Sequence, residues 1–148
     1  MPGSWGPEDF PHLKESNYKV TSDASPEYNC FSWAADETTR RWEPDQMEIN
    51  YRPPGVVREM TAEAFIEAYN SLGYSRCATT QLEVGFEKIL LYTDDDGTPT
   101  HAARQLPNGH WTSKLGDCED IEHETPASIE GPIYGSASVC LMRRVKVS

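Results

Sequence analysis

The sequence predicts an α+β domain, because the spacing of its apolar residues changes along the chain from the period of a helix to that of a strand. Between residues 61 and 73, apolar side chains recur on one face of a helix. After residue 85 they form short runs rich in aliphatic and aromatic residues, and clusters of turn-forming residues separate these runs. Helices followed by an antiparallel sheet make up the α+β arrangement.

The length and the charge limit what this domain can be. The 148 residues correspond to one domain, 1–148, which is large enough to bury a core without disulfides. With 13 basic and 24 acidic residues, the chain has a formal net charge of −11. This charge excludes nucleic acid as the main partner, because affinity for its backbone comes largely from lysine and arginine. No run approaches the ~20 apolar residues of a membrane helix, so we expect no membrane partner.

The chain begins with an expected irregular arm, which leads into the first predicted helix. Residues 1–27 are rich in proline and lack a sustained period, so we expect an arm with at most a short strand near Tyr18. Ser25-Pro26 is typical of a helix start. A helix is therefore expected within Glu27–Arg41, with Cys30 in its first turns.

A second helix follows a proline-rich loop over residues 42–60. Thr61 can cap this helix, and Gly73 can end it. The apolar residues between them share one face, which predicts that the helix packs against the sheet.

The second half of the chain predicts the antiparallel sheet. Asn108-Gly109 between two apolar runs is a strong hairpin signal. Residues 117–132 are acidic and are expected to form a loop, with one helical turn at 126–130. The predicted strands cover 86–92, 98–106, 110–115 and 136–145.

Cys30 and His101 are the strongest candidates for catalysis. A thiol becomes a nucleophile when it is ionised, and a helix start and a nearby imidazole both favour the thiolate. A third polar group usually orients the imidazole. If the hairpin contains a bulge or a longer loop, either Ser113 or Asp117 can lie beside His101, and we rank Ser113 first.

Further residues are expected around this pair. The backbone N–H of Cys30 is one candidate donor to an oxyanion, and Asn29 or Tyr28 would supply the second. Trp33 and Trp111 are expected to line or support a cleft.

The segments Asn29–Ala35 and Thr100–Ala103 resemble the papain-like cysteine hydrolases, and the compact NlpC-type branch is nearest in size. The resemblance implies a Cys-bearing N-terminal helix packed on a small antiparallel sheet, with no cofactor. It also implies that Cys30 is the nucleophile and His101 the general base. Ser113 falls at the orienting position, where the family usually has His, Asn, Gln or Asp.

Residues 28–144 also look like an uncharacterised bacterial domain family of similar length that has the same Asn-Cys-x-x-Trp-Ala start. That likeness implies no activity. The other matching segments are 85–88, 100–106, 111–116, 120–123 and Tyr134-Gly135.

The remaining cysteines are expected to be structural thiols, with Cys140 in the core and Cys77 in a structural position. Cys118 and His123 lie near several carboxylates, but the spacing matches no paired zinc pattern, so no metal is assigned. The N-terminus does not read as a secretory signal, which predicts a cytoplasmic protein or an effector secreted without a classical signal peptide.

These observations predict a thiol-dependent amide hydrolase that acts on a peptide or protein amide through an acyl-enzyme. One alternative is a non-catalytic papain-like binding or immunity module whose acidic surface engages a basic protein partner. Another is a transamidase or deamidase, acting as a toxin or effector with the same pair of residues.

Overall fold

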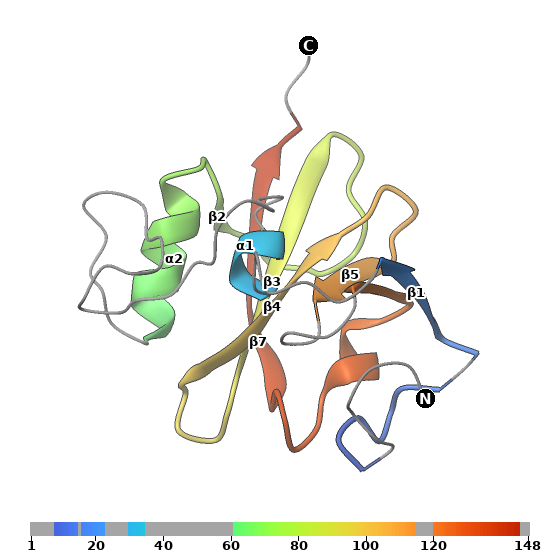
Figure 1. Cartoon of the computed structure of the whole chain (residues 1–148). Helices are drawn as coiled ribbons and strands as arrows, with labels where there is room; N and C mark the ends of the chain where they lie inside the picture. The colour runs from blue at the N-terminus through green and yellow to red at the C-terminus, as the bar shows by residue number, and fades with distance from the viewer. Residues whose placement is uncertain (1–7, 15, 23–29, 35–60, 115–119, 146–148) are drawn as a thin grey trace.

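The computed structural model describes residues 8–14, 16–22, 30–34, 61–114 and 120–145, and these residues form one seven-stranded antiparallel sheet (Figure 1). The strands lie in the order β1-β6-β5-β4-β3-β7-β2, so β1 and β2 are the two edges. The strands are β1 (Tyr18–Ser22), β2 (Ser75–Arg76), β3 (Phe86–Thr93), β4 (Pro99–Gln105), β5 (Trp111–Lys114), β6 (Asp120–His123) and β7 (Ser136–Arg144).

Helices are short in the described part of the chain. They are α1 (Cys30–Ala34), α2 (Ala62–Asn70) and the 3₁₀ turn η1 (Pro126–Ile129). Thr61 caps α2 as predicted, because its side chain accepts a hydrogen bond from the backbone of Ala64. None of these helices is long and apolar enough to cross a membrane.

The fold is therefore mainly β, and the predicted α+β, papain-like class is wrong. The short strand expected near Tyr18 forms as β1, whereas the expected acidic loop contributes the strand β6, which pairs with β1. Tyr18 lies opposite His123 in this ladder. Such a pairing between distant segments leaves no local period in the sequence, so it could not be predicted from the spacing of apolar residues. The predicted helix Glu27–Arg41 is described only over α1, and its remaining residues lie outside the described part.

The hairpin between β4 and β5 forms as predicted, but its turn is longer than Asn108-Gly109 alone. Leu106 donates its backbone N–H to His110 at 2.7 Å, which leaves three residues in the loop. Gly109 takes a φ of +90° there, as the last position of such a loop requires. The resulting register pairs Arg104 with Thr112, one residue away from that of a two-residue turn.

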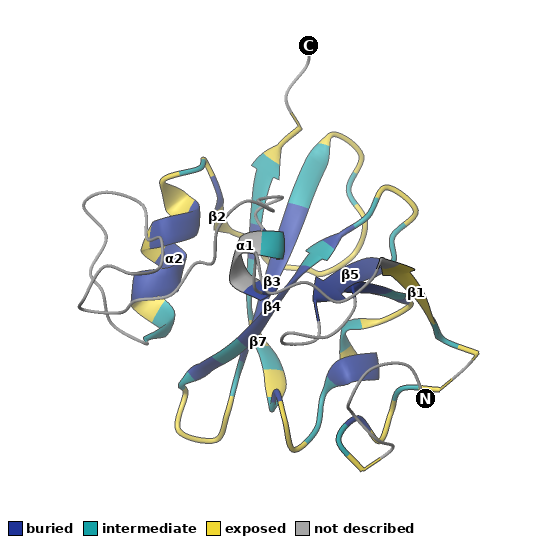
Figure 2. Ribbon diagram, viewed as in Figure 1, coloured by how far each residue is buried: buried dark blue, intermediate teal, exposed yellow. Residues whose placement is uncertain are grey.

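The sheet has a core on each side (Figure 2). On one side, α1 and α2 cover the sheet, and we call this the helix-side core. The other is the arm-side core, which includes Phe10 of the N-terminal arm and Ile129 of η1. The buried members of the helix-side core are Cys30, Ala34, Phe65, Ile66, Ala68, Tyr69, Tyr74, Ile89, Leu91, Ala102 and Leu141. Those of the arm-side core are Phe10, Leu90, Tyr92, Ala103, Trp111, Ile121, Ile129 and Tyr134.

We predict that Gly135→Ala destabilises the protein far more than Gly97→Ala. Both glycines have positive φ, but a Cβ at Gly135 would overlap the backbone carbonyl of Thr93, whereas a Cβ at Gly97 would meet open space. We expect a loss of about 1 kcal/mol for Gly97→Ala from backbone strain. Overpacking should add at least about 2 kcal/mol for Gly135→Ala. Urea unfolding of both variants measures this, and equal losses would contradict the packing around Gly135.

Candidate functional site

Cys30 is the first residue of α1, so its predicted place at a helix start is confirmed. It is a thiol, but it is only 7% exposed. It belongs to the helix-side core together with Leu91 of β3 and Ala102 of β4. The side chain therefore packs between α1 and the sheet.

His101 lies on β4, as predicted, and is completely buried. Its ring stacks on Tyr134 with the ring centroids 4.0 Å apart. The edge of Tyr92 contacts it with the centroids 5.4 Å apart. Tyr92 and Tyr134 both belong to the arm-side core, so His101 faces that side of the sheet.

The structure does not bring Cys30 and His101 together, because their side chains lie on opposite faces of the sheet. Successive side chains of a strand point to opposite faces. Ala102 shares the helix-side core with Cys30, so its neighbour His101 points the other way. Among the described residues, neither ring nitrogen of His101 has a hydrogen-bond partner. In the described structure the imidazole of His101 therefore cannot exchange a proton with the thiol of Cys30.

Ser113 pairs with a different histidine from the one predicted. Its hydroxyl lies 2.8 Å from Nε2 of His123, and Nδ1 of His123 lies 2.9 Å from the carbonyl oxygen of Thr125. The carbonyl requires a proton on Nδ1, so Nε2 accepts a hydrogen bond from the Ser113 hydroxyl. Ser113 and His123 are both fully buried, so this hydrogen-bonded pair holds β5 to β6 within the arm-side core.

The two predicted cleft tryptophans have structural contacts. Trp111 is buried in the arm-side core. Trp33 of α1 donates its ring N–H to Thr112 at 3.0 Å, and the guanidinium of Arg104 lies over its ring. These contacts fasten α1 to β4 and β5.

Three predicted site residues, Tyr28, Asn29 and Asp117, lie outside the described residues. Within the described ranges, no three His, Cys, Asp or Glu side chains are grouped so as to hold a metal ion.

Burial also shifts the pKa of both buried histidines. Loss of solvation lowers the pKa of His101 well below its ordinary value, and the nearby His123 lowers it further. Burial likewise lowers the pKa of His123 to about 4, although its hydrogen bond to the carbonyl of Thr125 acts to raise that pKa. Both imidazoles are neutral at pH 7, so neither supplies a charge that would ionise a thiol.

A hollow lies elsewhere, at the end of the sheet where β3 begins and β4 ends. Its volume is about 460 Å³, which falls within the range of ligand pockets. Arg104 and Gln105 of β4 and Glu83 and Glu87 supply polar groups to it. Most of its wall is apolar and consists of Leu82, Val84, Phe86, Leu106, Pro107 and Val145.

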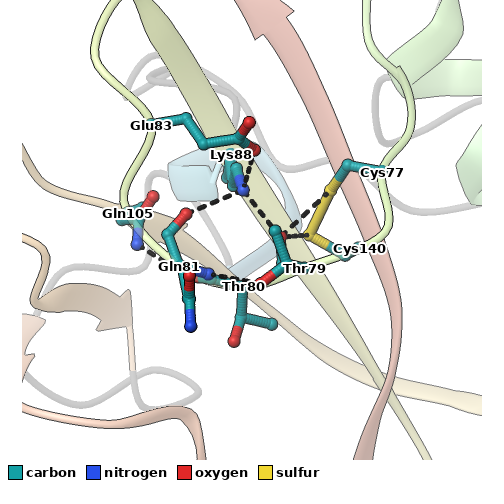
Figure 3. Close-up of polar contacts among 8 residues, drawn as sticks. All are labelled: Cys77, Thr79, Thr80, Gln81, Glu83, Lys88, Gln105 and Cys140. Carbon is teal, nitrogen blue, oxygen red and sulfur yellow. Dashed lines mark hydrogen bonds and ion pairs between the residues drawn. A yellow bond between two sulfur atoms is a disulfide. The ribbon is translucent and has the colours of Figure 1, made fainter.

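Residues 77–85, which we call the strap, provide one wall of this hollow. The strap connects β2 to β3 across the arm-side face, and four of its residues, 82–85, line the hollow. A disulfide joins Cys77 to Cys140 of β7, with the Cα atoms 5.4 Å apart (Figure 3). The prediction that both cysteines remain thiols is therefore wrong.

Lys88 and Gln105 were missed as contributors to this site. Lys88 is fully buried, and its ammonium contacts the strap, while Gln105 donates its amide N–H to Thr80 of the strap at 3.0 Å. The burial of Lys88 could have been expected from the sequence of β3. Side chains alternate between the two faces of a strand, so Lys88 lies on the same face as Leu90 and Tyr92. No comparable pattern marked the strap, because the hydrogen bonds that it receives from Lys88 and Gln105 go to backbone carbonyl groups.

Comparison with family models matches residues 19–142 to a domain of unknown function, DUF7689. The chain belongs to the DUF7689 family. The match runs from β1 to β7 and includes Cys30, His101 and the strap, so these features all lie within the DUF7689 domain. Comparisons with curated proteins and with solved structures gave no match.

We predict that the Cys30 thiol reacts slowly in the folded protein. Alkylation of a buried thiol requires local opening, and an opening free energy above about 1.4 kcal/mol slows the reaction at least about tenfold relative to the unfolded chain. Iodoacetamide labelling, followed by mass spectrometry of the Cys30 peptide with and without urea, measures this ratio. Rapid labelling of the folded protein that His101→Phe abolishes would contradict the separation of the two residues.

We predict that acid destabilises the fold through its buried histidines. The unfolded chain binds protons on these imidazoles below about pH 6.5, whereas the folded chain binds one at His123 only near pH 4. The free energy of unfolding should therefore fall as the pH drops from about 6.5 towards 4. Urea unfolding at a series of pH values measures this, and a constant midpoint across the window would contradict it.

The His101→Phe variant tests the part played by His101. It keeps an aromatic ring between Tyr92 and Tyr134 and removes two buried nitrogens that lack hydrogen bonds. We expect stability at pH 7 to rise by about 1 kcal/mol, and the dependence on pH to become shallower. If the variant is less stable than the wild type and its stability depends on pH in the same way, His101 is not an unpaired buried group.

Proposed function

We propose that the protein is a binding module that holds an apolar segment of a basic partner protein in the hollow at the end of the sheet. The observation that carries the proposal is the hollow itself, a mainly apolar depression of about 460 Å³. Hollows of this size and character are the usual sites of ligand and hot-spot binding.

The positions of Cys30 and His101 favour binding over catalysis. The predicted amide hydrolase needs the thiol and the imidazole within hydrogen-bond reach, or connected by one water. In the described structure they face opposite cores, and His101 is fully buried. The amide hydrolase and the related transamidase or deamidase stay predictions that depend on a different arrangement of these two residues.

Exposed apolar side chains at the hollow support an interaction with a partner. Val84 is 97% exposed at the turn before β3, and Leu82 and Val145 beside the hollow are each nearly half exposed. Clustered apolar side chains in contact with water are typical of interaction sites. A partner that covers them removes apolar surface from water, which stabilises the complex.

The charges favour a basic partner. The chain has a net charge of −11, which attracts cations over a distance. Glu83 and Glu87 line the hollow and remain partly exposed, although each also contacts a basic residue. The guanidinium of Arg104, by contrast, already contacts the carbonyl and the ring of Trp33. An apolar segment flanked by lysine or arginine would therefore match both the wall and the rim.

Gln105 adds a polar group to the site. Its amide nitrogen is fixed by the bond to Thr80, so the orientation of the amide is set. Its Oε1 atom is buried and has no hydrogen-bond partner among the described residues. An acceptor in this state is costly to leave unpaired, so a bound segment that reached it with an N–H group after a small movement of the side chain would gain free energy.

We predict that Val84→Arg weakens binding of a lysine-flanked peptide with tryptophan and leucine at its centre by about tenfold, which corresponds to about 1.4 kcal/mol. The change removes an apolar contact and adds a repelling charge at the hollow. Isothermal titration calorimetry of this peptide measures the effect. Because Val84 is 97% exposed, the variant should fold normally.

Val20→Arg is the matched control, since Val20 is also exposed but lies on the edge strand β1 and does not line the hollow. It should bind the peptide nearly as well as the wild type. Replacing the lysines of the peptide by glutamates, or its apolar residues by serines, should abolish binding. Equal losses in the two variants, or no binding of the lysine-flanked peptide, would refute the proposal.

A further inference from the structure

The strap is held over the arm-side face by three sets of contacts. The disulfide Cys77–Cys140 holds its beginning, and the backbone N–H of Cys77 also donates to Cys140 at 3.0 Å. Gln105 holds its middle at Thr80. Lys88 holds the stretch from Thr79 to Glu83 (Figure 3).

Because of Lys88, the strap has two favoured states, fully docked and fully released. Its ammonium group lies 2.6 Å from the carbonyl oxygen of Thr79, 2.7 Å from that of Gln81 and 2.5 Å from the carboxylate of Glu83. An ammonium group has three N–H donors, and the strap supplies a partner for each. If the strap moves away, a fully buried charge loses all three partners and must be hydrated instead. A partly lifted strap therefore has a higher free energy than either the docked or the released strap.

The disulfide adds a covalent contribution to the docked state. It links the strap to β7, a central neighbour of β3, and joins residues 63 positions apart in the sequence. A link across so many residues restricts the unfolded chain far more than the folded one. In the folded sheet the link fixes the first residue of the strap against β7. Both cysteines are half-buried, so a thiol reagent reaches them after a small movement.

We propose that the Cys77–Cys140 disulfide is a redox switch that controls the hollow through the strap. This inference rests on the proposed binding function of the hollow. Residues Leu82 to Gly85 of the strap line the hollow, so release of the strap removes one wall. Release also frees the amide of Gln105, which the strap holds at Thr80. The oxidised protein holds the hollow in its binding form, and the reduced protein loses it.

The chemistry of the switch is thiol–disulfide exchange with a dithiol. A thiolate of the reductant attacks one sulfur of the disulfide, the S–S bond breaks, and the other cysteine leaves as a thiolate that takes up a proton. The second thiol of the reductant then attacks the mixed disulfide. Two electrons and two protons pass to the protein, giving two thiols, and the reductant becomes a disulfide.

Hydrogen exchange tests the strap without a ligand. In the oxidised protein, we expect protection of the backbone amides of Cys77, Gln81 and Phe86, which donate hydrogen bonds to Cys140, Thr79 and Glu83. Reduction with dithiothreitol should speed their exchange at least about tenfold. The amides of β4 should stay protected, because the sheet remains folded. Unchanged exchange in the strap, or equal loss of protection in β4, would overturn the switch.

Peptide binding then tests the link to the hollow. The lysine-flanked peptide should bind the oxidised protein and lose at least about fivefold in affinity, about 1 kcal/mol, on reduction. If the oxidised protein fails to bind it, the proposed function fails, while the exchange data still decide whether the strap responds. If both forms bind equally, the switch is overturned and the binding function stands.

Two variants separate the disulfide from other effects of the reductant. Cys77→Ser combined with Cys140→Ser should give fast strap exchange and weak binding at every redox state. Cys30→Ala keeps the disulfide and should respond to dithiothreitol like the wild type. If dithiothreitol changes strap exchange or peptide binding in the double variant, or changes neither in Cys30→Ala, the effect of the reductant belongs to another group and the proposal is overturned.

Discussion

The alternation of side chains along β4 is the constraint on which the rest of this structure depends. β4 lies near the middle of the sheet, and both of its faces are covered. Ala102 therefore packs under α1 with Cys30, while His101 and Ala103 pack on the arm side. A shift of one residue in this strand would exchange the two faces. The position of the imidazole relative to the thiol follows from this alternation and from nothing in the local sequence.

Much of the sheet could be predicted from the sequence, because its central strands carry local signals. The runs that became β3, β4, β5 and β7 are bounded by turn-forming residues, and the Asn108-Gly109 turn marked the hairpin. The class was wrong because β1 and β6 pair across about a hundred residues. Neither segment has an apolar run of its own, so the sequence predicted at most a short strand for β1 and a loop for β6. The number of strands, and hence the balance of sheet and helix, could not be predicted from spacing alone.

The candidate site could be predicted less well, for a related physical reason. Sequence motifs indicate which residues can do chemistry, and Cys30 does lie at a helix start with His101 on a strand. They do not indicate which face of the sheet each side chain occupies. Ser113 lies in a hairpin strand as expected, but the pairing of β4 with β5 ends at Arg104 and Thr112, and Ser113 hydrogen-bonds to His123 of β6 instead. The hydrogen bonds from Lys88 and Gln105 to the strap go to backbone carbonyl groups, which every sequence has.

The hollow at the end of the sheet is where we propose that this acidic chain presents apolar surface to a partner. The most direct test of the separation of Cys30 and His101 is a set of nuclear Overhauser effects from the ring protons of His101 in the folded protein. Contacts with the rings of Tyr92 and Tyr134, and none with the β-protons of Cys30, are expected from the geometry. Strong contacts with Cys30 would place both groups on one face and restore the case for a thiol hydrolase.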